Sequence, residues 1–161
     1  MSGAGSYQDQ LGGELDGSGL QIALVVARFN GDLTGRMRDS ALETLVRHGM
    51  DEDDVEIIPV PGAWELPQVV GAIAEGGTVQ AIIALGCVIR GDTPHFDFVA
   101  GEASRGLMDV ALATGVPVIL GLLTTENREQ AEERADPARQ DKGGEAALAA
   151  LEMATLFRTD A

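Results

Sequence analysis

Residues 81–89 read AIIALGCVI, and this stretch does most to decide the fold class. It belongs to a predicted strand over residues 79–89, in which apolar residues follow one another without polar alternation. An unbroken apolar run of this length suits a strand that is buried on both faces, as in a parallel sheet. Shorter runs of the same kind occupy residues 21–27, 55–60 and 116–123. The sequence therefore predicts four buried strands.

Segments with helical spacing of apolar residues lie between and after these strands. The predicted helices are residues 33–48, 64–74, 96–114, 126–135 and 141–157. Strands that alternate with helices form right-handed βαβ units, which make the sheet parallel and cover both of its faces. We therefore predict a three-layer α/β/α sandwich with a four-stranded parallel sheet, a flavodoxin-like arrangement. It forms one domain over residues 20–161, after a flexible, Gly- and Ser-rich arm over residues 1–19.

The composition argues against several classes of protein. Of the 161 residues, 26 are acidic and 11 are basic, which gives a net charge of −15 with histidine neutral. Such a charge disfavours duplex nucleic acid and anionic membranes, because both attract basic surfaces. No apolar run approaches the roughly 20 residues that span a bilayer, and no signal peptide is recognisable. Cys87 is the single cysteine, which excludes an internal disulfide. Because this fits a reducing compartment, the chain is expected to be cytoplasmic.

Ligands of an open parallel sheet bind beyond the carboxyl ends of its strands, where the next helices begin. That rule selects residues 28–30, 62–65, 87–95 and 120–125. His95 lies in the third of these segments, and an imidazole exchanges protons near neutrality. Because lone histidines are usually structural, its residue type alone leaves the role of His95 open.

Other side chains in these segments suit a flat, anionic ligand. Phe29 and Trp64 can stack on a heterocycle, and Glu65 can accept hydrogen bonds from ring N–H groups. Asp92 and Thr93 precede a helix whose first backbone N–H groups can hold an anion. Each has an ordinary structural interpretation as well: aromatic core packing, an acid in a helix's first turn, or a helix cap.

Arg134 and Cys87 complete the candidates, while His48 is interpreted as structural because it precedes Gly49 at a helix end. Arg134 can grip a phosphate through two N–H groups, or pair with a nearby glutamate on its own helix. Cys87 has no base beside it in sequence and is interpreted as a packing residue. The chain has no dinucleotide-binding glycine fingerprint, P-loop or zinc-ligand cluster. The residues alone thus predict an aromatic-lined cleft with one candidate for proton transfer.

Several stretches resemble the hallmark segments of the 6,7-dimethyl-8-ribityllumazine synthase family. They are RFN at residues 28–30, PGAWELP at 61–67, GCVIRGDTPHFD at 86–97, GLLTTEN at 121–127, EQA at 129–131, ERA at 133–135 and DKG at 141–143. These segments follow the family's order and spacing, so the resemblance covers nearly the whole of the predicted domain.

The resemblance implies a transferase that catalyses the penultimate step of riboflavin biosynthesis. 5-Amino-6-(D-ribitylamino)uracil condenses with 3,4-dihydroxy-2-butanone 4-phosphate to 6,7-dimethyl-8-ribityllumazine, with release of phosphate and water and with neither metal nor organic cofactor. By this resemblance His95 transfers protons. The residues implied to bind the aminouracil are Phe29, Ala63, Trp64, Glu65, Cys87, Val88, Ile89 and Leu120, and those for the butanone phosphate are Asp92, Thr93 and Arg134.

The same resemblance implies a homo-oligomer whose active sites lie between subunits, with Leu120 and Arg134 reaching the site of a neighbour. The expected minimum is a pentamer. The resemblance leaves open whether the chain also forms a sixty-subunit icosahedral shell and whether it associates with riboflavin synthase. The arm is expected to add to a neighbouring subunit's sheet. Leu120 stands where many members have Phe, and Asp141 where Asn is common. The alternative is a non-catalytic flavin- or lumazine-binding protein, or a shell-forming structural protein, of the same fold.

Overall fold

The computed structural model describes residues 14–158. Its elements, in chain order, are β1 (Ile22–Ala27), α1 (Gly31–Arg47), the 3-10 turn η2 (Glu52–Asp54), β2 (Val55–Val60), the 3-10 turn η3 (Ala63–Glu65), α2 (Leu66–Gly76), β3 (Ala81–Ile89), α3 (His95–Thr114), β4 (Val118–Thr125), α4 (Arg128–Ala135) and α5 (Lys142–Phe157). Each predicted strand and helix is present. The predicted helix over residues 64–74 instead begins with η3, and α2 starts at Leu66 with a proline in its first turn.

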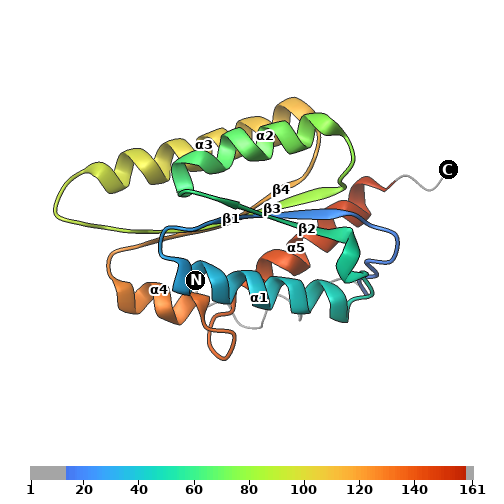
Figure 1. Ribbon diagram of the computed structural model, residues 1–161, viewed down its shortest axis with the longest axis horizontal. Coiled ribbons are helices and arrows are strands. Elements are labelled where there is room, and N and C mark those ends of the chain that lie inside the picture. Colours follow the sequence, from blue (N-terminus) through green and yellow to red (C-terminus); the bar gives the residue numbers. More distant parts are fainter. Residues whose placement is uncertain (1–13, 159–161) are drawn as a thin grey trace.

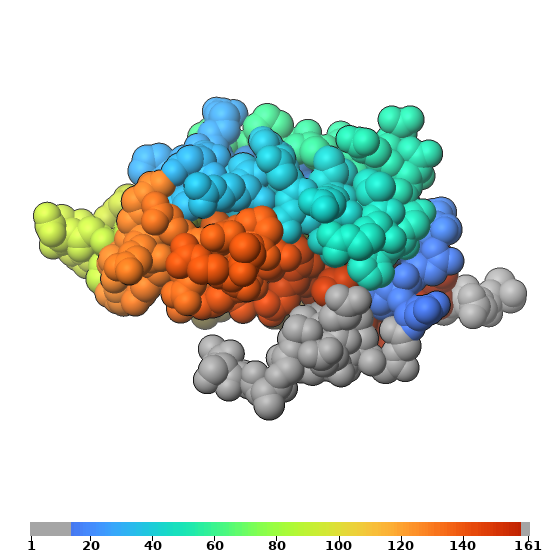
Figure 2. Space-filling model, turned by 90° about the horizontal axis from the view of Figure 1, so that it is seen from below, coloured from blue at the N-terminus to red at the C-terminus, as the bar shows by residue number. Residues whose placement is uncertain are grey.

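The four strands form one parallel sheet in the order β2-β1-β3-β4. Helices α2 and α3 cover one face of the sheet, and α1, α4 and α5 cover the other (Figures 1 and 2). The prediction of a three-layer, flavodoxin-like α/β/α sandwich is therefore confirmed. None of the helices within residues 14–158 is both long and apolar enough to cross a membrane.

Two hydrophobic cores lie on the two faces of the sheet, and β1 contributes to both. Leu24 points toward α1 and α5, whereas its neighbour Val25 points toward α2 and α3. All six residues of β1 are buried, which explains why this strand is apolar throughout. Helix α5 lies so close to α1 that a Cβ atom at Gly143 would overlap the backbone of Met37. Glycine is therefore required at that crossing.

Part of the predicted arm falls inside the described residues. The N–H of Gly17 donates to the carbonyl of His48 over 2.8 Å, and Leu15 packs against the core formed with α1 and α5. The remainder of the arm, residues 1–13, lies outside the described residues, and so does its expected addition to a neighbour's sheet.

The connections place a switch point between β1 and β3. The chain leaves β1 toward α1 on one face of the sheet, and it leaves β3 toward α3 on the other (Figure 1). Adjacent parallel strands whose connections diverge in this way leave a crevice at their carboxyl ends. The fold therefore places a ligand site where the candidate residues of these strands lie.

Candidate active site

A cleft of about 980 Å³ lies at the carboxyl ends of β1, β2 and β3, beside the start of α3. Its lining residues are Phe29, Asn30, Pro61, Gly62, Ala63, Trp64, Glu65, Val88, Ile89, Gly91, Thr93, His95, Phe96, Phe98 and Val99. Eight predicted site residues thus come together here: Phe29, Ala63, Trp64, Glu65, Val88, Ile89, Thr93 and His95. The volume is that of an ordinary small-molecule site.

Backbone hydrogen bonds hold the Phe29 side of the cleft in place. The N–H of Phe29 donates to the carbonyl of Pro61 over 3.1 Å, which joins the ends of β1 and β2. Asn30 has a left-handed backbone, with φ 57°, and precedes α1, but its side chain does not cap that helix. Its Nδ2 instead donates to the carbonyl of Cys87 over 2.9 Å, which ties β1 to β3. The Phe29 ring stays 70% exposed and forms a wall of the cleft.

Trp64 and Glu65 enter the cleft from η3. This turn follows Gly62, whose carbonyl accepts the N–H of Glu65 over 3.2 Å. Ala63 is buried beneath the turn, while the Trp64 side chain remains about half exposed. An aromatic ring and a carboxylate thus stand side by side at the end of β2, where a ring with N–H groups can meet both.

His95 is the first residue of α3 and its side chain is exposed at the cleft. Its backbone N–H lies 3.4 Å from Oγ1 of Thr93, and no hydrogen bond of its ring occurs within residues 14–158. Asp92 is exposed and near in sequence, but it does not line the cleft. His48 lies elsewhere, at the end of α1, with its Nδ1 2.9 Å from the carbonyl of Thr44. Its interpretation as a structural residue fits this contact.

Cys87 lies on β3 with its side chain on the face opposite the cleft. The thiol is buried in the core beneath α1, whereas the next residue, Val88, packs on the cleft side. Burial raises the pKa of the Cys87 thiol to about 11. A neutral, buried thiol is a poor nucleophile, so a packing role suits it. Its link to the cleft is the backbone carbonyl that holds Asn30.

Leu120 and Arg134 lie away from the cleft. They line a separate groove of about 350 Å³ on β4, together with Lys142 and Glu145 of α5. The Nη1 of Arg134 donates to the carbonyl of Gln130 over 3.1 Å, and no carboxylate within residues 14–158 forms an ion pair with it. The pairing with a glutamate considered from the sequence is thus not observed, and the guanidinium remains available to an anion.

Sequence reasoning missed part of the cleft wall. Asn30, Phe96, Phe98 and Val99 line the cleft although none was singled out as a site residue. Phe96 and Val99 are spaced three apart on α3, a spacing that predicts one helix face but does not distinguish a core from a cleft. Arg90 lies in the selected segment 87–95 but was not among the predicted site residues, and its guanidinium contacts both Asp97 and Glu126.

The arrangement is suited to acid–base chemistry on a flat polar ring. Phe29 and Trp64 offer aromatic faces, Glu65 offers an acceptor, and His95 offers an exposed imidazole. Within residues 14–158, no cluster of three or more His, Cys, Asp or Glu side chains is placed to hold a metal ion. A family model described as 6,7-dimethyl-8-ribityllumazine synthase matches residues 19–158.

Proposed function

Because the chain belongs to the 6,7-dimethyl-8-ribityllumazine synthase family, whose members are transferases of riboflavin biosynthesis, we propose that it catalyses the condensation itself. In this reaction 5-amino-6-(D-ribitylamino)uracil and 3,4-dihydroxy-2-butanone 4-phosphate combine to 6,7-dimethyl-8-ribityllumazine, with release of phosphate and water. The observation that carries the proposal is the cleft at the β1/β3 switch point, which brings Phe29, Trp64 and His95 together.

The aminouracil occupies the aromatic part of the cleft in this proposal. Phe29 stacks on the pyrimidine, and Glu65 accepts hydrogen bonds from its N–H groups. Trp64, Ala63, Val88 and Ile89 enclose the remainder of the ring and the start of the ribityl chain. Cys87 contributes through its backbone, because its thiol points into the opposite core.

His95 moves the protons that the condensation requires. The 5-amino group adds to the ketone and one water leaves, phosphate is eliminated, and attack of the ribitylamino nitrogen on the remaining carbonyl closes the ring with loss of a second water. Each of these steps transfers a proton to or from nitrogen, carbon or oxygen, which is the work of an imidazole near neutrality. Holding the two reactants in the correct relative orientation supplies much of the acceleration, because orientation alone can lower the activation barrier by about 7–11 kcal/mol.

The butanone phosphate is held by groups from two copies of the chain. Thr93 and the backbone beside Asp92 lie at the cleft, while Arg134 and Leu120 line the separate groove. A neighbouring copy that places its groove against the cleft brings the guanidinium to the phosphate. The proposed assembly is a closed ring, with a pentamer as the minimum, and light scattering of the purified protein measures its size.

Incubation of the purified protein with both substrates tests the proposal. The lumazine chromophore is expected to accumulate faster than in the matched mixture without protein, and inorganic phosphate is expected to appear with it. A rate equal to that of the uncatalysed mixture would contradict the proposed activity.

A further inference from the structure

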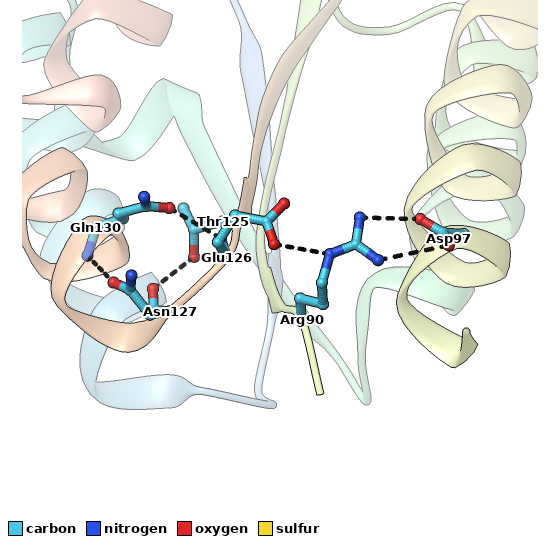
Figure 3. A network of polar contacts seen from close by, with 6 residues as sticks. All are labelled: Arg90, Asp97, Thr125, Glu126, Asn127 and Gln130. Carbon is cyan, nitrogen blue, oxygen red and sulfur yellow. Dashed lines mark hydrogen bonds and ion pairs between the residues drawn. The ribbon is translucent and has the colours of Figure 1, made fainter. Parts of the chain in front are cut away.

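Arg90 stands directly after β3 and contacts three side chains from two other parts of the fold. Its Nε lies 2.8 Å from a carboxylate oxygen of Glu126, and its Nη2 lies 3.2 Å from Oδ1 of Asp97. The guanidinium carbon also lies 4.5 Å from the centre of the Phe96 ring. Figure 3 shows the guanidinium between the end of β4 and the first turn of α3. One side chain thus joins the two elements.

The Glu126 end of this contact is firmly held. The backbone N–H of Arg90 donates to the carbonyl of Thr125 over 2.8 Å, which continues the pairing of β3 with β4. The N–H of Glu126 donates to Oε1 of Gln130, and the Asn127 side chain caps α4 by accepting the N–H of Gln130, each over 2.9 Å. Figure 3 shows the contacts of Gln130 with Glu126 and Asn127 on the side of the network away from α3. The backbone of Glu126 is therefore held in place at the end of β4.

Apart from those with Arg90, the polar contacts of residues 91–97 in the described part of the chain stay within this segment and its helix: the N–H of Asp97 donates to the carbonyl of Pro94 over 3.0 Å, and that of His95 to Oγ1 of Thr93 over 3.4 Å. Pro94 precedes the helix and its side chain provides no cap, and residues 91–94 are all exposed. This segment extends beyond the body of the molecule in both views (Figures 1 and 2). Phe96 and Asp97 directly follow His95, so a group that holds both of them also holds the turn that carries the imidazole.

We propose that Arg90 is a positioning residue for His95. Its planar fork binds Asp97 with two N–H groups while its face covers Phe96, and Glu126 keeps the guanidinium from turning away. Ion pairs as exposed as these contribute little to folding. The contact therefore acts on the orientation of the first turn of α3. This inference rests on the proposed function, in which His95 transfers protons.

Replacement of the guanidinium tests the inference. In Arg90→Met, kcat is expected to fall about 10- to 100-fold, the range that a small misplacement of a reacting group produces. Both KM values and the unfolding transition are expected to stay close to those of the parent protein. Arg90→Lys is expected to recover part of kcat, because an ammonium keeps the charge but not the fork. An unchanged kcat in Arg90→Met would overturn the inference.

Arg128→Met is the matched control. Arg128 is also a half-exposed arginine that pairs with two carboxylates, those of Asp32 and Glu132, but it joins α4 to α1. Its loss removes a similar ion-pair network without touching α3, so kcat is expected to be retained. A loss of kcat equal to that of Arg90→Met would show a general effect of removing surface ion pairs and would overturn the inference.

Asp97→Asn weakens the same contact by removing the carboxylate charge that Arg90 binds. The kcat of this variant tests the inference even if Arg90→Met folds poorly. If both substitutions act by one contact, the double variant loses no more kcat than the more affected single variant. A double variant whose loss of kcat equals the product of the two single losses would overturn the inference.

Hydrogen exchange gives a readout that does not depend on activity. The backbone amides of residues 95–97 are expected to exchange faster in Arg90→Met, whereas those around His48 keep their rate. Unchanged exchange at residues 95–97 would overturn the inference. A parent protein that makes no lumazine would instead contradict the proposed function, while the exchange result still decides whether Arg90 holds this turn.

Discussion

The cleft beside β3 and the groove on β4 offer different chemistry. The cleft presents aromatic faces and the imidazole of His95, whereas the groove presents Arg134 beside Leu120. A flat ring suits the first surface and a phosphate suits the second. The two hollows share no lining residue, so one protomer carries two halves of the proposed site that do not meet. In the proposed function, the two halves of the site are therefore brought together by two copies of the chain and not by one.

Substitution of His95 removes the imidazole from the cleft and is expected to lower kcat more than any other single change. In His95→Ala, kcat is expected to fall about 10²- to 10⁴-fold, the range for loss of a general acid–base group. Assembly is expected to persist, because the side chain is exposed and its ring makes no hydrogen bond within residues 14–158. Steady-state kinetics and light scattering measure the two properties.

His48→Ala is the matched control for that experiment. The His48 ring contacts the carbonyl of Thr44 at the end of α1, away from both hollows. Its loss is expected to lower the free energy of unfolding by about 1 kcal/mol while kcat stays unchanged. Equal turnover in both histidine variants would remove His95 from the mechanism.

Substitution of Arg134 removes the guanidinium from the groove on β4. In Arg134→Ala, the KM for the butanone phosphate is expected to rise about 10- to 100-fold, because a hydrogen bond to a charged group is worth about 1.5–3 kcal/mol. The KM for the aminouracil is expected to change little. Arg134→Lys should retain part of the affinity through its charge. A change in the aminouracil KM alone would refute the assignment of Arg134 to the phosphate.

Co-expression of the His95→Ala and Arg134→Ala chains tests whether the halves come from different copies. In a ring assembled at random from equal amounts, about a quarter of the sites join an intact His95 to a neighbour's intact Arg134. At a butanone phosphate concentration near the parent KM, where both variants turn over slowly, the mixed protein is therefore expected to exceed the average activity of the two variants assayed alone. If both groups of a site belonged to one copy, no mixed site would be intact and activity would stay at the level of the variants.

The thiol of Cys87 lines neither hollow, so its replacement is expected to have the least effect. Burial raises the pKa of this thiol to about 11, above its ordinary value of 9.0, so the native protein keeps a proton that the unfolded chain loses. The contribution to stability is complete below about pH 9 and declines as the pH rises toward 11. Denaturant titrations of the parent and Cys87→Ala across this range measure it. A parent with the same slope as Cys87→Ala would contradict the assignment.

Much of the fold and part of the site follow from local patterns. The apolar runs at residues 81–89 and 21–27 predict buried strands, and the rule for carboxyl ends places Phe29, Trp64 and His95 at one edge of the sheet. The contacts that shape the cleft join distant residues. Asn30 bonds to Cys87, 57 positions away, and Arg90 pairs with Glu126. No local pattern predicts such pairs, because they depend on strand order and register.

The class of fold, the edge of the sheet that holds the cleft and the family to which the chain belongs can all be inferred from the amino-acid sequence. These follow from hydrophobic period, turn residues and short motifs, which are properties of neighbouring residues. Two features become evident from the packed structure alone: the thiol of Cys87 faces the core beneath α1, and Arg134 lies in a different hollow from His95. The physical reason is that the direction of a side chain, and the surface it joins, depend on how each strand and helix packs against partners far away in the chain.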